Sequence, residues 1–338
     1  MRFGLSLPHY GFSSPDGAPI TFEACAGWAE RAERLGFDSV WLSDHFFYSF
    51  GRYGADPAPI ASLEPLTTLA GLATRTARVR LGTLVLGAPF RHPGLLLKTA
   101  ASLDALSGGR LDLGLGAGWL KDEFDAFGYG FGTVGERFDR LAETLALFTA
   151  AVRADGGPVS FDGRTVTLRE AHVLPAAVQR PIPVWVGGKG GPRLLRLAAR
   201  HAAGWNLAWR ISPGGYDEKL EGVRAACASV GRDPATFRLS VGLHALLGED
   251  EAAARAAFER GRAAMPGGAL DAETYGSWRA DTLSGTPAEA LARVAEFEAR
   301  GVEEIVVAPW VLPFAIPEPA QVELFADQVI APLRAGGA

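Results

Sequence analysis

The feature that most constrains the fold is a regular alternation of short apolar runs with amphipathic segments. Segments such as 21–36, 93–109 and 134–153 repeat apolar residues at helical spacing. The apolar runs between the helical segments are mostly continuous, as in parallel strands buried on both faces. The eight apolar runs lie at 2–8, 38–43, 79–87, 110–118, 182–188, 204–209, 237–246 and 303–310. Eight strands with helical crossovers predict an α/β fold, a closed (β/α)8 TIM barrel, with an open doubly wound sheet as the alternative.

Two insertions interrupt this alternation, at 155–180 and at 265–285, and both are expected to be rim loops. The first contains a run at 160–168 that alternates polar and apolar residues around Asp162-Gly163, which predicts a β-hairpin outside the main sheet. The chain has no evident internal repeat or low-complexity tract. We therefore expect one domain over residues 1–338.

Composition narrows the classes of partner. Of the 338 residues, 48% are hydrophobic and 21% charged, enough to form a large core, and the net charge is -5 with acids and bases interspersed. This balance argues against nucleic acid or an anionic membrane as the main partner. No uncharged apolar run reaches the roughly 20 residues that span a bilayer. Cys25 and Cys227 form no CxxC pair, so we expect neither a zinc site nor disulfides, and a cytoplasmic location.

In TIM barrels the active site lies at the carboxyl ends of the strands. Three histidines and several aromatic residues fall there, without a cluster of carboxylates, which favours an aromatic-lined pocket over a metal centre. The candidates are His9, Tyr10, Asp44, His45, Thr83, Leu84, Val85, Ala117, Trp119, the segment 187–191, Asn206, His244 and Trp310.

The fifth strand ends in a glycine-rich turn formed by Gly187, Gly188, Lys189, Gly190 and Gly191, before a helix that begins near Pro192. Bare amides at a helix N-terminus can bind an anion, to which Lys189 or Arg193 could add charge. The spacing matches neither a Walker motif nor a Rossmann turn. A merely flexible glycine turn is the alternative.

Asp44 and His45 follow the second strand directly. A histidine at a barrel strand end can hold or take a proton at working pH, whereas an isolated one more often bonds a nearby carbonyl. Glu64 is expected to cap the second helix. Trp119 and Trp205 are expected to be packing residues, although Trp119 could form a wall for a flat ring.

Several blocks together resemble the luciferase-like monooxygenase family of flavin and deazaflavin oxidoreductases. They are "DSVWLSDHF", "RVRLGTLVLGAPFRHPGLLLKTAASLDALSGGRLDLGLGAGW", "VGERFDRLAE", "IPVWVGGKGGPRLLRLAARHAAGWN" and "SGTPAEALARV". The similarity is greatest to the branch that uses coenzyme F420, an 8-hydroxy-5-deazaflavin. The resemblance implies a (β/α)8 barrel, in agreement with the pattern above.

The resemblance also implies roles for individual residues. It places Asp44 and His45 against the deazaflavin, with His45 tied to hydride transfer, and a bulge with a cis peptide at Leu84-Val85 behind the ring. It maps the glycine turn onto the phosphate-binding element, with amides of Gly187, Gly188 and Gly190 as donors. Cofactor contacts are further expected from Thr83, Ala117 and Trp119.

The resulting hypothesis is an F420-dependent oxidoreductase that transfers a hydride between the deazaflavin and a small organic substrate. Trp119 and Ser49 replace a glutamate and a tryptophan of the sugar-phosphate dehydrogenase branch, so a sugar phosphate is not expected. Segments 46–53, 127–131 and 265–278 are expected to set the substrate. The alternatives are a monooxygenase that uses reduced FMN from a flavin reductase partner, and a non-catalytic flavin-binding protein. Because many members of this family form dimers, the resemblance also implies a homodimer.

Overall fold

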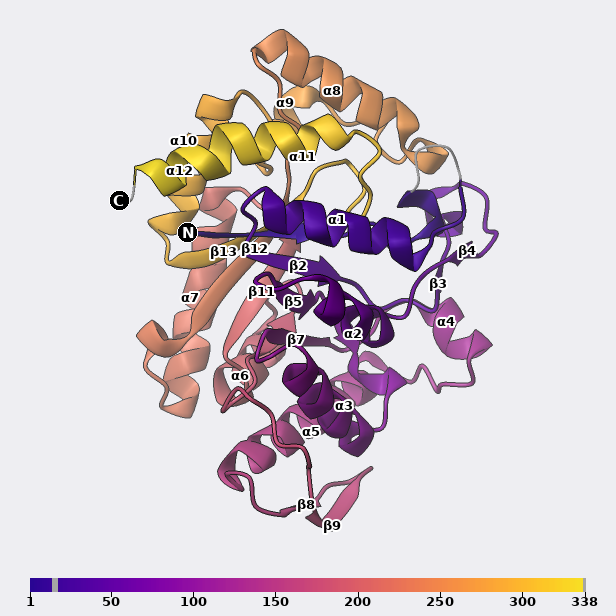
Figure 1. Ribbon diagram of the computed structural model, residues 1–338, viewed down its shortest axis with the longest axis vertical. Coiled ribbons are helices and arrows are strands. Elements are labelled where there is room, and N and C mark those ends of the chain that lie inside the picture. Colours follow the sequence, from indigo (N-terminus) through magenta and orange to yellow (C-terminus); the bar gives the residue numbers. More distant parts are fainter. Residues whose placement is uncertain (14–17, 337–338) are drawn as a thin grey trace. The chain divides into compact units, whose positions relative to one another are not determined.

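The barrel strands follow the predicted order along the chain (Figure 1). The computed structural model describes residues 1–13 and 18–336. The parallel sheet runs β10-β11-β12-β13-β1-β2-β5-β7, and pairing of β7 with β10 closes it. The strands are β1 (Arg2–Ser6), β2 (Ser39–Leu42), β5 (Arg80–Thr83), β7 (Leu111–Gly116), β10 (Val184–Gly187), β11 (Gly204–Trp209), β12 (Arg238–His244) and β13 (Val302–Ala308). The predicted (β/α)8 barrel is confirmed, and closure excludes the open sheet.

The third predicted strand is divided in two. β5 is followed by the short strand β6 (Leu86–Gly87), and both pair with β7. Leu81 is opposite Leu111, an offset of 30, whereas Leu86 is opposite Leu115, an offset of 29. One extra residue therefore lies between the two pairings, which is a bulge, and the Leu84-Val85 peptide there is cis as predicted.

The helices also match the predicted segments, because caps in the sequence fix their ends. Thr21 accepts a hydrogen bond from the Ala24 amide, and Thr133 forms a capping box with Glu136. Glu64 caps α2, the structural role expected of it. The helices are α1 (Phe22–Arg34), α2 (Pro65–Arg75), α3 (Pro93–Leu106), α4 (Lys121–Ala126), α5 (Val134–Arg153), α6 (Pro192–His201), α7 (Pro213–Val230), α8 (Glu251–Ala264), α9 (Tyr275–Ala280), α10 (Pro287–Glu298), α11 (Pro319–Phe325) and α12 (Ala331–Ala335), the last two joined by a π-helical turn, η6 (Ala326–Ile330).

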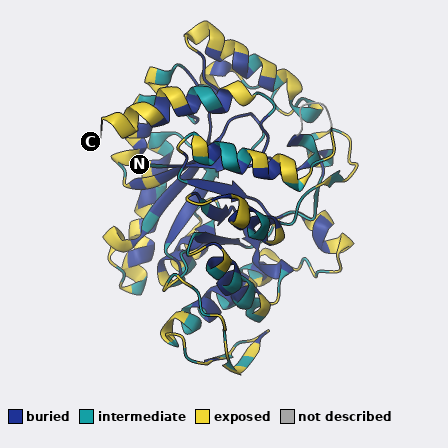
Figure 2. Cartoon of the chain, in the orientation of Figure 1, coloured by how far each residue is buried: buried dark blue, intermediate teal, exposed yellow. Residues whose placement is uncertain are grey.

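The strands of the barrel are largely buried, while each large helix exposes one face (Figure 2). The contacts between residues divide the chain into two compact units. Unit 1 contains residues 1–63, 207–220 and 239–338, and unit 2 contains residues 64–206 and 221–238. Cys25 and Cys227 lie in α1 and α7 and are free thiols.

The first insertion, in unit 2, forms the predicted hairpin. Its strands β8 (Val159–Asp162) and β9 (Thr167–Ala171) make a separate two-stranded sheet beside α5 (Figure 1). The Glu143 carboxylate of α5 accepts hydrogen bonds from the amides of Thr165 and Val166 at 2.8 and 3.0 Å. Because the insertion connects a helix to the start of β10, it belongs to the amino ends of the strands, opposite to the end where the candidate residues lie.

The second insertion, in unit 1, is not a simple loop. It contains α9, and its Tyr275 and Trp278 are only 3% and 1% exposed. Arg210, directly after β11, forms ion pairs with Glu273 at 2.7 Å and Asp281 at 2.9 Å. The sequence prediction of a loop here was wrong, because six-residue helices and long-range ion pairs leave little trace in a Gly/Pro-rich segment.

Candidate functional site

The ends of β1 and β2 bring the first candidate residues of unit 1 together. Ser6 is paired with Trp41 in parallel register, and the Leu7 amide donates to the Trp41 carbonyl at 3.0 Å. The chain then continues as His9-Tyr10 from one strand and Ser43-Asp44-His45 from the other. Asp44 is 5% exposed, whereas His45 is half-buried. His45 is therefore the member of the pair that a ligand can reach.

A chain of three side-chain hydrogen bonds lies beneath this pair. His9 Nδ1 lies 2.9 Å from the carbonyl of Leu7, and His9 Nε2 lies 3.2 Å from Ser43 Oγ. The Tyr10 hydroxyl lies 2.5 Å from the same Ser43 oxygen. A carbonyl only accepts, so Nδ1 of a neutral His9 carries the proton, Nε2 accepts from Ser43, and Ser43 accepts from Tyr10.

Burial holds His9 in the neutral form. Complete burial, the main cause, and the nearby His45 together lower the pKa of His9 to about 4, against the opposing hydrogen bonds at Leu7 and Ser43. At neutral pH the network therefore has one direction of donation. His9, a catalytic candidate by position, accepts a hydrogen bond from Ser43, and its lowered pKa makes it a weak base near neutral pH.

Aromatic rings surround the pair. The His45 ring lies edge-on to Tyr48 at 5.5 Å between centroids and 6.1 Å from Tyr10. Phe12 stacks on Tyr10 at 4.8 Å and meets Phe50 edge-on at 5.3 Å. Several aromatic rings of unit 1 therefore pack close to His45.

Segment 46–53 is ordered by a short hairpin. β3 (Phe47–Tyr48) pairs antiparallel with β4 (Ile60–Ala61), and the Ser62 hydroxyl donates to the His45 carbonyl. Ser49 is buried and donates to the Pro57 carbonyl at 3.0 Å. Segment 46–53, which is expected to help set the substrate, is therefore held in place by these contacts.

His244 at the end of β12 is covered by the second insertion. Its Nδ1 donates to the Trp310 carbonyl at 2.6 Å, and its ring lies 4.9 Å from that of Trp278. It is 4% exposed. His244 and Trp310 thus form part of a packed layer.

In unit 2, Val85 of the bulge packs against two strand-end glycines. A Cβ at Gly187 would lie 2.5 Å from Val85 Cγ1, and one at Gly116 would lie 2.6 Å from Val85 Cγ2. Any larger residue at these positions would clash. The neighbouring Thr83 is buried, and its hydroxyl bonds to the Gly114 backbone at 2.8 and 3.0 Å, so this side chain serves strand pairing.

The glycine turn between β10 and α6 has the backbone that a tight anion loop requires. Gly188 and Gly190 have φ values of 150° and 74°, which L side chains rarely adopt. The Gly188 amide donates to the Asn206 carbonyl at 3.2 Å, and its carbonyl accepts from the Trp205 indole at 2.9 Å. The amide of Gly188 is therefore already in use, which makes those of Gly190 and Gly191 the stronger candidates for an anion.

The end of this turn has room for a ligand. Gly191 is the N-cap of α6, no side chain caps the helix there, and a Cβ at Gly191 would meet no atom within 4 Å. Lys189 is an exposed residue, yet partial desolvation still lowers the pKa of its ammonium group. An open helix N-terminus beside a lysine fits a phosphate group.

Arg193, the other cation proposed for the turn, has a structural role. It pairs with Asp139 of α5 and donates to the Gly135 carbonyl at 3.2 Å. Arg137 of the same helix donates to the carbonyls of Gly118 and Gly132 at 3.3 and 3.1 Å. The "VGERFDRL" motif therefore ties α5 to the turn helix α6 and to the loop after β7, a role that sequence reasoning missed.

The two tryptophans expected to pack differ from each other. Trp205 is fully buried and pins the glycine turn, as described above. Trp119 is 46% exposed, so the packing expectation was wrong for it. It follows Ala117 and Gly118 in the loop after β7, where the φ of 75° at Gly118 turns the chain outward.

The comparison with family models gives the identification. The model described as luciferase-like monooxygenase matches residues 1–304. The chain belongs to this family. An F420-dependent glucose-6-phosphate dehydrogenase of Amycolatopsis mediterranei is 36% identical over 205 residues, 59% of each chain. An F420-dependent hydroxymycolic acid dehydrogenase of Mycobacterium tuberculosis is 36% identical over 231 residues, 68% of this chain and 60% of that protein.

These alignments span about three fifths of the length of the two curated relatives. Among solved structures, the monooxygenase RslO1 from Streptomyces bottropensis superimposes with a TM-score of 0.74 at 26% identity, covering 98% of this chain and 100% of that one. The family and fold expected from the sequence are confirmed.

Residues 1–13 and 18–336 contain no group of three His, Cys, Asp or Glu side chains placed to hold a metal ion. In the same part of the chain, no helix combines the length and apolar character needed to cross a membrane.

Proposed function

We propose that this protein is an F420-dependent oxidoreductase that transfers a hydride between the deazaflavin and a small organic substrate. The proposal is carried by the 36% identity of this chain to each of two F420-dependent dehydrogenases. It is supported by the residues that follow the barrel strands, which include Asp44-His45 and the glycine turn. The deazaflavin supplies the hydride chemistry when bound. The protein supplies binding, orientation and a proton.

Each residue has a role in this proposal. Backbone amides of Gly190 and Gly191, at the N-terminus of α6, bind the cofactor phosphate, with Lys189 adding positive charge. His45 holds or accepts the proton that accompanies hydride transfer, and Asp44 orients the imidazole. Tyr10, Tyr48 and Phe12 exclude water from His45. Ala117, Trp119, Leu84 and Val85 are proposed to contact the cofactor, and Thr83 to hold the strand behind it.

A binding titration tests the choice of cofactor. The purified protein is titrated separately with F420 and FMN, and quenching of ligand fluorescence is recorded. We expect saturable binding of F420 and much weaker binding of FMN. Tight FMN binding without F420 binding would refute the proposal.

The role of His45 is tested by His45→Ala. Loss of a general acid or base lowers turnover by about 10²- to 10⁴-fold. We expect a fall of this size in kcat, with F420 affinity and thermal stability close to those of the parent. His172→Ala, at an exposed position just after β9, is the matched control. Full activity in His45→Ala would rule out the assignment.

A monooxygenase that uses reduced FMN is the second candidate, favoured by the 26% identity to RslO1 over almost the whole chain. It would need a flavin reductase partner. Oxygen consumption dependent on reduced FMN and a substrate would support it over the F420 reaction. Turnover in either assay would refute the third reading, a non-catalytic flavin-binding protein.

The substrate is proposed to be a small molecule other than a sugar phosphate. Ser49 is buried and bonded to Pro57, and Trp119 stands where the sugar-phosphate branch has a carboxylate. We expect no F420 reduction with glucose 6-phosphate, and such activity would contradict this assignment. The homodimer and the cytoplasmic location also remain predictions.

A further inference from the structure

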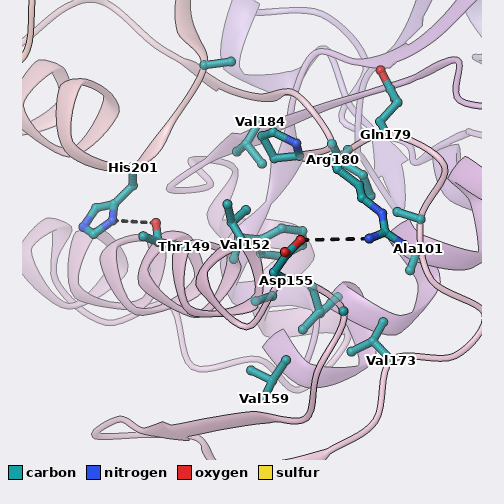
Figure 3. A pocket seen from close by; sticks show the side chains of 18 of the residues that line it. Ala101, Thr149, Val152, Asp155, Val159, Val173, Gln179, Arg180, Val184 and His201 are labelled. Atoms are coloured by element: carbon teal, nitrogen blue, oxygen red, sulfur yellow. Dashed lines mark hydrogen bonds and ion pairs between the residues drawn. The ribbon is translucent and has the colours of Figure 1, made fainter.

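Unit 2 contains a cavity of about 480 Å³ between the end of α5, the segment after β9 and the turn after α6 (Figure 3). Its walls are largely apolar. They include Leu97, Ala101, Phe148, Val152, Val173 and Val184. Cavities of roughly 300–1,000 Å³ with apolar walls and a few polar groups are typical of small-molecule sites.

The cavity lies away from the candidate site. β10 begins at Val184, which lines the cavity, and ends at Gly187, where the glycine turn starts. The strand rises about 3.3 Å per residue, so three steps separate its two ends by roughly 10 Å. The cavity therefore belongs to the amino end of the strand, and none of its lining residues is one that the proposed reaction uses.

The polar groups around the cavity are mainly cationic. The cations are Arg180, Arg200 and Arg232, His201 also lines the cavity, and Asp155 is the one carboxylate among the described lining residues. Asp155 and Arg180 lie 3.9 Å apart, with side chains 85% and 64% exposed, so this ion pair is weak (Figure 3). Arg180 can therefore exchange Asp155 for another anion at little cost.

Arg232 adds positive charge to the cavity. No carboxylate of the described residues forms an ion pair with it there. Its guanidinium donates to the carbonyls of Ala199, Ala202 and Ala203 at 2.6–3.2 Å. Carbonyl dipoles satisfy its hydrogen bonds but leave its net charge in place. The charge in the cavity is thus positive overall.

His201 reports the same positive potential. Its Nδ1 lies 2.9 Å from the hydroxyl of Thr149 (Figure 3). Burial lowers the pKa of His201, and the charges of Arg200 and Arg153 lower it further.

We propose that this cavity binds a small amphipathic anion, with an apolar body between α3 and α5 and a carboxylate head near Arg180 and Arg200. Apolar walls bind the body, and the net positive charge of the lining residues selects an anion over a neutral molecule of the same length. The assignment is independent of the F420 proposal.

The test uses decanoate and its neutral counterpart decanol, titrated into the full-length protein by calorimetry. We expect decanoate to bind at least ten-fold more tightly than decanol. Arg180→Gln combined with Arg200→Gln should remove this preference. Equal binding of the two ligands, or no binding of decanoate, would overturn the proposal.

A second pair of variants places the site. Val152 lines the cavity and is 51% exposed, whereas Val178 is 58% exposed and lies outside the lining. Val152→Asp should weaken decanoate binding at least ten-fold, and Val178→Asp should leave it unchanged. F420 affinity should be equal in both. Equal decanoate affinity in the two variants would overturn the location.

Discussion

At the scale of single residues, His9 and His45 show how burial separates two histidines with the same kind of position. Both follow a strand at its carboxyl end. His9 is fully buried and hydrogen-bonded at both ring nitrogens, whereas His45 is half-buried among aromatic rings. Of the two, only His45 is accessible to a ligand, so the proton-transfer role is proposed for it.

His9 makes stability depend on pH. Its pKa is about 4 in the folded state and 6.5 when exposed, so between these values the unfolded chain binds more protons. Stability therefore falls as the pH drops from 6.5 to 4. The difference of 2.5 units corresponds to about 3 kcal/mol.

We expect His9→Asn to lack this component. Chemical unfolding of the parent and variant at pH 7 and pH 4 gives the comparison, because the acidic residues they share cancel in the difference. The parent should lose about 3 kcal/mol more than the variant across this range. Equal losses would show that His9 is not held neutral.

Sequence reasoning placed Asp44 and His45 just after the second strand, where the structure has them, because the end of a strand follows from an apolar run that stops. It could not find the bond from Tyr10 to Ser43, which joins residues 33 positions apart. Such a contact depends on the parallel register of β1 and β2. That register is a tertiary property with no local pattern.

At the scale of elements, Val85 packs against both Gly116 and Gly187, and this contact sets the spacing between the ends of β7 and β10. We expect Gly187→Ala to lower the free energy of unfolding by about 1–3 kcal/mol through overpacking. Val85→Ala should restore part of that loss in the double variant. If the changes in unfolding free energy of the two single variants simply add in the double variant, the side chains at positions 85 and 187 are not in contact.

Gly191→Ala is the matched control for this pair, since a Cβ there meets no atom within 4 Å. It should leave stability nearly unchanged. Under the proposed function it should weaken F420 binding by narrowing the end of the turn. A loss of stability as large as that of Gly187→Ala would contradict the difference in packing.

Arg137 tests the connection between α5 and the loop after β7. Its hydrogen bonds to three carbonyls, those of Gly118, Phe131 and Gly132, involve a charged donor, and each is worth about 1.5–3 kcal/mol. Arg137→Met should lower the unfolding midpoint clearly, whereas Arg140→Met, on the exposed side of α5, should not. Equal unfolding midpoints for Arg137→Met and Arg140→Met would contradict the role assigned to Arg137.

The elements themselves were largely predictable. Capping residues such as Thr21 and Thr133 determine helix starts locally, so 134–153 was predicted with both ends correct. The division of 79–87 came from the family resemblance, because its apolar pattern continues unbroken. The short helices α4 and α9 were missed, since six residues give too few turns for a periodic signal.

At the scale of the whole molecule, the two compact units are interleaved along the chain. Unit 1 is assembled from three segments, and β11 begins in unit 2 and ends in unit 1. The closed sheet also takes its strands from both. No single cut separates the units, which supports the proposal of one domain over residues 1–338.

We therefore expect one cooperative thermal transition. In calorimetry the van't Hoff enthalpy should equal the calorimetric enthalpy, provided that unfolding is reversible. Two separate transitions would contradict the single-domain proposal. The barrel was predictable because its alternation extends along the whole chain, whereas the interleaving depends on contacts between distant segments.

The directed hydrogen bonds from Tyr10 to Ser43 and on to His9 have a consequence for the lifetime of their protons. Hydroxyl protons in water exchange too fast to be observed, but Tyr10, Ser43 and His9 are at most 6% exposed. Exchange must wait for local opening of the structure. The Tyr10 and Ser43 hydroxyl protons should give separate resonances in a proton NMR spectrum, a record of how often this end of the barrel opens to water.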